Sequence, residues 1–134
     1  MSHQLFTVTQ NAIIQDNKGR VLILEQEGKW MLPGGMINEN EVSWLDALKR
    51  EVFEETGISE LEVIGVLEVD CWRDEKGRFF YGANFLCTTS ESQMKNIKLS
   101  SEHNQFVWVA KEDLGNYNFF HEKIKKRIFR ALEK

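Results

Sequence analysis

The sequence predicts an α/β fold in which a mixed β-sheet lies between helices. Three observations support this fold class: two pairs of strand-like segments flank turn-forming residues, an amphipathic helix follows a short strand, and a second helix closes the chain. Helices and strands in this order usually pack as layers around one core. A chain of 134 residues is long enough to bury such a core, so we expect a single domain over residues 1–134.

Composition excludes several classes of protein. Hydrophobic residues make up 42% and charged residues 28%, as in ordinary globular domains. The formal net charge of -4 gives no reason to expect nucleic-acid binding, and the apolar runs are too short to span a membrane. Cys71 and Cys87 lack metal-ligand spacing, and the first residues do not resemble a signal peptide. We therefore expect a cytoplasmic protein with reduced thiols.

Two strand-like segments begin the chain, Phe6–Gln15 and Arg20–Glu25, and residues 16–19 between them (Asp-Asn-Lys-Gly) have turn chemistry. This pattern predicts a β-hairpin. A short strand around Trp30–Leu32 then leads into Pro33-Gly34-Gly35. Proline keeps the residue before it extended, and glycines let the backbone approach a ligand closely or take positive φ.

A helix is predicted from Trp44 to Thr56. Ser43 is a good N-cap, and Gly57 stands where helices commonly end in the left-handed conformation. The helix carries an apolar stripe for packing against a sheet, made of Leu45, Ala47, Leu48 and Val52.

The second half of the chain continues the alternation. Leu61–Trp72 and Phe79–Thr88 flank a second turn and predict another hairpin. Residues 90–101 are polar and predict a loop, and Phe106–Val109 predicts a strand followed by a short turn at residues 111–114. The chain then closes with a helix over about Phe120–Leu132.

The last helix is amphipathic and basic. Its apolar stripe is Ile124, Ile128, Ala131 and Leu132. Its basic residues are Lys123, Lys125, Lys126, Arg127 and Arg130. We favour a packed helix with a solvated charged face over a surface for an anionic partner.

Three carboxylates share one face of the first helix. Glu51, Glu54 and Glu55 are three or four residues apart, so their side chains can converge. An exposed acidic face would explain them, because like charges at this spacing cost only about 0.2 to 0.5 kcal/mol per pair. A site for a hard divalent cation such as Mg²⁺ is the alternative, because that ion prefers carboxylate oxygens. The helix alone favours the exposed face.

A longer pattern reverses that preference. Gly35 is followed after five residues by Glu41, and residues 50–58 read Arg-Glu-Val-Phe-Glu-Glu-Thr-Gly-Ile. This pattern resembles the signature of the Nudix hydrolases of the MutT type, and the match is complete from Arg50 onward. Eight residues separate Glu41 from Arg50 where the family has seven. We place the extra residue, Val42, at the junction of loop and helix, where an insertion is tolerated, and assign no role to Glu41.

The resemblance implies a fold and a set of site residues. The fold is the Nudix-type α/β/α sandwich with a mixed β-sheet, from about Phe6 to Leu132. The implied metal ligands are Glu51, Glu54, Glu55, the Gly34 carbonyl and Glu102, an acidic residue upstream of the final strand. Arg50 would orient a ligating glutamate, and either Glu54 or Glu102 would act as general base. The histidines form no cluster in sequence, so a solvated or hydrogen-bonded role is expected for His3, His103 and His121.

The resemblance also implies an activity. We expect hydrolysis of a phosphoanhydride bond in a nucleoside diphosphate derivative with Mg²⁺, or alternatively Mn²⁺, because the ion neutralises the phosphates and acidifies a water. A nucleoside triphosphate fits the short chain best, while ADP-ribose, nucleotide sugars and dinucleoside polyphosphates remain open. The partner would be a nucleotide-type small molecule, bound by a monomer or homodimer. A Nudix-like module that binds a nucleotide without cleaving it, and a purely structural domain, are the alternatives.

Overall fold

The computed structural model describes residues 2–133 and contains two β-sheets and helices on either side of them. In chain order the elements are β1 (Thr7–Ile14), β2 (Arg20–Gln26), β3 (Lys29–Met31), β4 (Gly34–Met36), α1 (Trp44–Thr56), β5 (Glu62–Arg73), β6 (Phe79–Thr88), α2 (Glu91–Lys95), β7 (Gln105–Ala110), the 3-10 helix η1 (Lys111–Asn116) and α3 (Glu122–Leu132).

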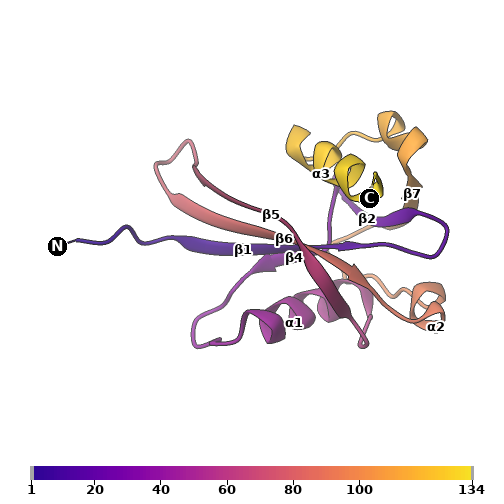
Figure 1. The fold of residues 1–134 in the computed structure, drawn as a ribbon, viewed down its shortest axis with the longest axis horizontal. Coiled ribbons are helices and arrows are strands. Elements are labelled where there is room, and N and C mark those ends of the chain that lie inside the picture. Colours follow the sequence, from indigo (N-terminus) through magenta and orange to yellow (C-terminus); the bar gives the residue numbers. More distant parts are fainter. Residues whose placement is uncertain (1, 134) are drawn as a thin grey trace.

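The larger sheet is mixed. Its strand order is β4-β1-β6-β5, with β1 parallel to β6 and the other pairs antiparallel. A smaller antiparallel sheet has the order β3-β2-β7. Helix α1 lies on one side of the sheets and α3 on the other (Figure 1). The predicted α/β/α sandwich with a mixed sheet is therefore confirmed.

Two hydrophobic cores explain the layers. Ile13 of β1 and Ile23 of β2 belong to the core under α3, whereas their neighbours Ile14 and Leu24 belong to the core under α1. Successive side chains of a strand point to opposite faces, so both strands are buried on both faces. This double burial accounts for the apolar runs at residues 12–14 of β1 and 21–24 of β2.

The first predicted hairpin is wrong. β1 and β2 lie in different sheets and share one isolated bridge, between Gln15 and Val21. The turn between them does form, because the Asp16 carboxylate accepts hydrogen bonds from the Lys18 and Arg20 backbone N–H groups at 2.9 and 2.8 Å. The turn residues determine where the chain reverses direction. Which strands pair is determined instead by the burial of β1 and β2 on both faces. The second predicted hairpin, β5 with β6, is confirmed.

Smaller differences concern short elements. The Gly34–Met36 segment, predicted as a turn, pairs with β1 as β4. The polar loop contains α2, with Ser90 as its N-cap, and the turn after β7 is η1. None of the helices within residues 2–133 is long and apolar enough to cross a membrane.

Helix α1 has the predicted bounds and caps. The Ser43 hydroxyl accepts a hydrogen bond from the Asp46 backbone N–H at 3.2 Å. Gly57 has φ 78° and donates its N–H to the Phe53 carbonyl at 2.9 Å. The helix packs through Ala47, Leu48 and Val52, which leaves its carboxylates on the other face.

The apolar stripe of α3 is confirmed, but its basic face is only partly solvated. Lys123 pairs with Asp70 at 3.1 Å, and Arg127 pairs with Glu68 at 3.0 Å. Glu68 also pairs with Arg130. These ion pairs fasten α3 to strand β5, whereas Lys125 and Lys126 are exposed.

Candidate catalytic and metal site

The glycine pair brings the backbone against the α1 carboxylates. The Gly34 N–H donates a hydrogen bond to Glu55 Oε1 at 2.9 Å. Gly34 has φ 152°, and a Cβ at this position would lie 2.1 Å from the Gln10 carbonyl oxygen. A Cβ at Gly35 would lie 2.5 Å from the Glu51 carboxyl carbon. Position 34 therefore requires glycine, because the close atom belongs to the backbone. At position 35 a side chain would instead displace the flexible carboxylate of Glu51, a predicted ligand.

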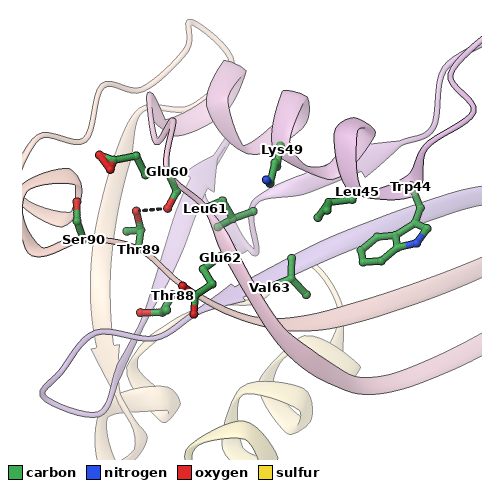
Figure 2. Close-up of a pocket in the computed structure, with 10 residues that line it drawn as sticks. All are labelled: Trp44, Leu45, Lys49, Glu60, Leu61, Glu62, Val63, Thr88, Thr89 and Ser90. Carbon is green, nitrogen blue, oxygen red and sulfur yellow. Dashed lines mark hydrogen bonds between the residues drawn. The ribbon is translucent and has the colours of Figure 1, made fainter.

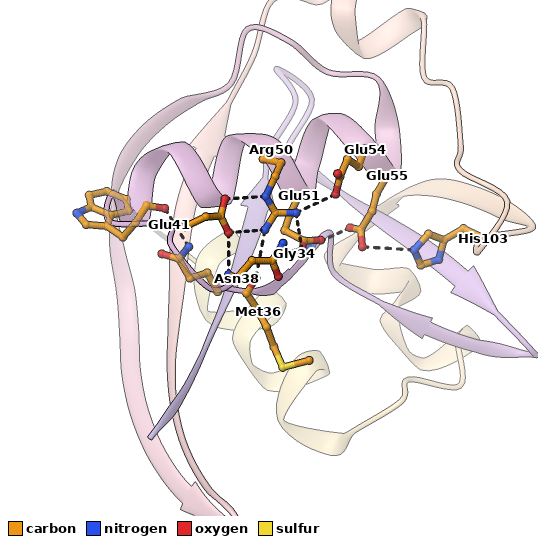
Figure 3. A network of polar contacts seen from close by, with 11 residues as sticks. Gly34, Met36, Asn38, Glu41, Arg50, Glu51, Glu54, Glu55 and His103 are labelled. Atoms are coloured by element: carbon orange, nitrogen blue, oxygen red, sulfur yellow. Dashed lines mark hydrogen bonds and ion pairs between the residues drawn. The ribbon is translucent and has the colours of Figure 1, made fainter. Parts of the chain in front are cut away.

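Arg50 connects three carboxylates (Figure 3). Its Nε and Nη2 donate to the two oxygens of Glu41 at 2.7 and 2.9 Å, a bidentate arrangement. Its Nη1 donates to Glu51 at 3.0 Å and to Glu54 at 2.9 Å. Arg50 thus contacts the side chains of two predicted ligands.

The insertion leaves this network intact. Val42 is 100% exposed, so the extra residue extends into solvent between the loop and the helix. Glu41 consequently reaches Arg50 and also accepts a hydrogen bond from the Asn38 N–H at 2.7 Å. Contact with Arg50 holds the pKa of Glu41 below its usual value. Glu41 thus belongs to the candidate site, although the sequence pattern alone left it without a role.

A distant segment closes the other end of the site. After α2 the chain crosses the C-terminal end of α1, where Lys98 N–H donates to the Thr56 carbonyl at 2.8 Å and Ser100 N–H to the Glu55 carbonyl at 3.3 Å. These bonds satisfy carbonyls that a helix end leaves free. They place Glu102 and His103 beside Glu55.

Glu55, Glu102 and His103 form a compact group. One ligand atom from each side chain lies within 4.8 Å of the others. Glu102 is exposed, whereas His103 is only 6% exposed, so the expectation of a solvated or hydrogen-bonded histidine is wrong. His103 Nε2 lies 3.7 Å from Glu55 Oε2. Burial lowers the pKa of His103, so the ring is neutral and this contact is not an ion pair.

Burial also sets the charge of the carboxylates. It raises the pKa of Glu55 to about 8, despite the hydrogen bond from Gly34, with the nearby Glu51 and Glu102 acting in the same direction. Burial raises the pKa of Glu51 as well, although Arg50 opposes the shift. A divalent cation would offset this desolvation and repulsion, because it favours the ionised carboxylates.

The donor set suits a divalent cation. Carboxylate oxygens are the ligands of Mg²⁺ and Mn²⁺, and an imidazole nitrogen extends the set toward transition metals. In the structure Glu55 and Glu102 lie close to His103. Glu51 and Glu54 each form an ion pair with Arg50. Gly34 lies beside Glu55 through its N–H.

A cleft of about 600 Å³ opens beside the glycine pair. Gly34 and Gly35 form part of its lining, together with the aromatic side chains of Trp72 and Phe120 and the basic side chain of Arg73. This volume is typical of small-molecule sites, which are of about 300 to 1,000 Å³. The cleft therefore offers apolar surface and positive charge beside Gly34 and Gly35, which on their other side meet Glu55 and Glu51.

A second hollow, of about 720 Å³, lies between the N-terminal part of α1 and the β5–β6 hairpin (Figure 2). Its lining includes Trp44, Lys49 and Glu62. The carboxylates held by Arg50 line neither this hollow nor the cleft at Gly34. We favour the cleft as the functional site because Gly34 and Gly35 of its lining contact Glu55 and approach Glu51.

A model of the NUDIX domain family matches residues 5–132. The chain belongs to the Nudix family, and it is a Nudix hydrolase, an enzyme of the class that acts on phosphorus-containing anhydrides. The fold, the glycine pair and the carboxylates of α1 agree with this assignment.

Individual proteins match this chain at low sequence identity or over only part of its length. The nucleoside triphosphatase NudI of Klebsiella pneumoniae is 26% identical over 118 residues, which cover 77% of this chain and 81% of that protein. An RNA pyrophosphohydrolase of Bartonella henselae is 56% identical over 36 residues, but these cover only 27% of this chain and 20% of that protein. A MutT protein from Methanosarcina mazei has the same fold, with a TM-score of 0.76, 24% identity and coverage of 98% of this chain and 96% of that structure.

Proposed function

We propose that the protein is a Mg²⁺-dependent nucleoside triphosphate pyrophosphohydrolase that also accepts Mn²⁺. The observation that carries the proposal is the meeting of three features: the α1 carboxylates, the close backbone of Gly34 and Gly35, and the cleft that these glycines line. Hydrolysis of a phosphoanhydride needs cations that neutralise the phosphate oxygens. A triphosphate bound in this cleft would lie beside these glycines, which meet the carboxylates that could hold such a cation.

Each site residue receives a role in this proposal. Glu51, Glu54, Glu55 and Glu102 hold the ion, with the Gly34 carbonyl as a further ligand. Arg50 orients Glu51 and Glu54, and Glu41 in turn fixes Arg50. The bound ion supplies charge neutralisation and a more acidic water. Glu54 or Glu102 accepts the proton of the attacking water, because both are exposed enough to meet solvent.

The cleft supports the proposed substrate class. Trp72 and Phe120 offer aromatic surface for a base, and Arg73 offers positive charge for phosphates. The similarity to NudI supports a nucleoside triphosphate. We further propose a single cytoplasmic domain that acts as a monomer or homodimer on free nucleotides, without a nucleic-acid or membrane partner.

A substrate panel tests the proposal. Nucleoside triphosphates, ADP-ribose, a nucleotide sugar, a dinucleoside polyphosphate and an RNA with a 5′-triphosphate are each incubated with Mg²⁺, and phosphate and pyrophosphate release are followed. We expect pyrophosphate from a nucleoside triphosphate. Greater turnover of another member would replace the proposed substrate. Tight nucleotide binding without turnover would instead favour a non-catalytic module.

The variant Glu54→Gln tests whether the assigned carboxylates are needed for turnover of the substrate found in the panel. We expect it to lower turnover by at least about 100-fold, since even residues that only position a ligand typically cost 10- to 100-fold. Glu112→Gln is the control, because Glu112 is an exposed residue of η1. Equal activity of Glu54→Gln and the control would contradict the assigned site.

A further inference from the structure

His103 is the residue of the site that the proposed function does not use. It is 6% exposed, and among residues 2–133 neither of its ring nitrogens makes a hydrogen bond of good geometry, although the Glu25 backbone lies close enough to act on the ring. A buried polar atom without a partner is destabilising, so such an atom in a folded protein calls for an explanation such as a bound ion or water. His103 therefore points to a ligand.

The backbone holds His103 firmly in this place. Its N–H donates to the Ser100 carbonyl at 3.3 Å, and the next residue, Asn104, donates its N–H to the Glu25 carbonyl at 2.9 Å. The chain on both sides is thus fixed, to α1 through Ser100 and to β2 through Glu25. The ring is directed at Glu55 by ordered backbone on either side (Figure 3).

The distance to Glu55 suits a shared ion better than a direct bond. Nε2 and Glu55 Oε2 are 3.7 Å apart, which is too far for a hydrogen bond. Two ligands at about 2.0 to 2.2 Å from one ion are separated by roughly 3 to 4 Å, depending on the angle between them. Glu102 lies within the same group, so one ion could contact all three side chains after small side-chain movements.

We propose that His103 Nε2 is a nitrogen ligand of a divalent ion held jointly with Glu55 and Glu102. The inference rests on the proposed function for the presence of an ion, and it adds a nitrogen to an otherwise all-oxygen set. Imidazole suits transition metals, whereas Mg²⁺ prefers oxygen. The position shared by these three residues consequently prefers Mn²⁺ to Mg²⁺.

Pulsed electron paramagnetic resonance of the Mn²⁺-loaded protein tests the ligand directly. The full chain is prepared with ordinary histidine and with ¹⁵N-histidine, and the nuclear coupling to Mn²⁺ is compared. We expect a directly bonded nitrogen whose signal changes with the isotope. Mn²⁺ bound without such coupling would overturn the role of His103 and leave the carboxylate site standing. Absence of stoichiometric Mn²⁺ binding would contradict the proposed function itself.

Variants assign the signal to one residue. His103→Gln should abolish the nitrogen coupling and reduce the preference for Mn²⁺ over Mg²⁺ by about tenfold or more in competition titrations. His3→Gln, at an exposed residue outside the helices and strands, should change neither quantity. Coupling that survives in a folded His103→Gln protein would overturn the proposal. The isotope comparison on the wild-type chain decides the question even if His103→Gln does not fold.

Discussion

Arg50 is the residue on which the arrangement of the site depends most. Its guanidinium donates to Glu41, Glu51 and Glu54, and Glu51 is only 18% exposed in its side chain. Lysine carries the same charge, but it lacks the planar fork that binds a carboxylate through two bonds. The contacts therefore predict that the planar shape of the Arg50 guanidinium, and not its charge alone, is required to hold the glutamates in place.

Arg50→Lys should lower kcat/KM by about 10- to 100-fold, because Glu51 and Glu54, the proposed ligands, lose their orientation. Steady-state kinetics with the best substrate of the panel measures this effect. Arg20→Lys is the matched control, since Arg20 pairs with Asp16 at the remote β1–β2 turn. Unchanged kinetics for Arg50→Lys would show that the glutamates do not need this arginine.

Glu55 predicts an unusual dependence of stability on pH. Its pKa is raised from 4.5 to about 8 in the folded, metal-free protein. Between these two values the folded state keeps a proton that the unfolded state has lost. The free energy of unfolding contributed by this group is therefore fully present below pH 4.5 and is lost as the pH rises through 8.

Urea denaturation in the presence of a chelator measures this dependence. Over that pH range, wild type should lose free energy of unfolding relative to Glu55→Gln, which cannot ionise. Added Mn²⁺ or Mg²⁺ should restore stability at pH 8, because the ion favours the charged carboxylate. Parallel pH curves for the two proteins would contradict the assigned burial of Glu55.

Among the elements, the short strand β4 links fold and site most directly. Gly34→Ala would place a Cβ 2.1 Å from the backbone oxygen of Gln10, whereas Gly35→Ala would meet the flexible end of Glu51 at 2.5 Å. The first collision involves backbone and the second a side chain. The two variants should therefore separate stability from activity.

Gly34→Ala should destabilise the protein by about 2 to 4 kcal/mol, and Gly35→Ala by no more than about 1 kcal/mol. Gly35→Ala should nevertheless lower activity by at least about tenfold, because Glu51 is displaced. Gly115→Ala is the control, since a Cβ there would have no atom within 4 Å. Thermal denaturation and kinetics give both quantities, and full activity in Gly35→Ala would refute the close contact with Glu51.

How far the elements can be predicted from sequence depends on whether their signals are local. Helix α1 follows from Ser43, Gly57 and an apolar stripe, all within or next to the helix. The pairing of β1 with β6 could not be predicted, because the turn at residues 16–19 specifies a reversal but not a partner. The packing of His103 against Glu55 could not be predicted either, because only the folded chain after α2 brings them together.

At the level of the whole molecule, the two cysteines differ in solvent exposure and can therefore probe whether the core is closed. Cys71 is exposed at the surface of β5, whereas Cys87 is 1% exposed in the core under α1. Burial raises the pKa of the Cys87 thiol to about 12, so its reactive thiolate is scarce in the folded protein.

Titration with a thiol reagent should find one fast-reacting cysteine in the native protein and both in the denatured one. The slow reaction of Cys87 should follow global unfolding, because its core contacts β1, β2 and α1 together. Cys71→Ser should remove the fast phase alone. Two fast thiols in the native protein would contradict the closed core.

In the proposed function, α1, the Gly34–Gly35 backbone and the Glu102 segment hold a divalent cation against the phosphates of a nucleotide. A crystal structure of the protein with Mn²⁺ and a non-hydrolysable nucleoside triphosphate analogue is the decisive experiment. We expect the ion on Glu55 and Glu102, with the phosphates in the cleft beside Gly34. A nucleotide seated instead in the hollow at Lys49, with the carboxylates turned away from any ion, would contradict it.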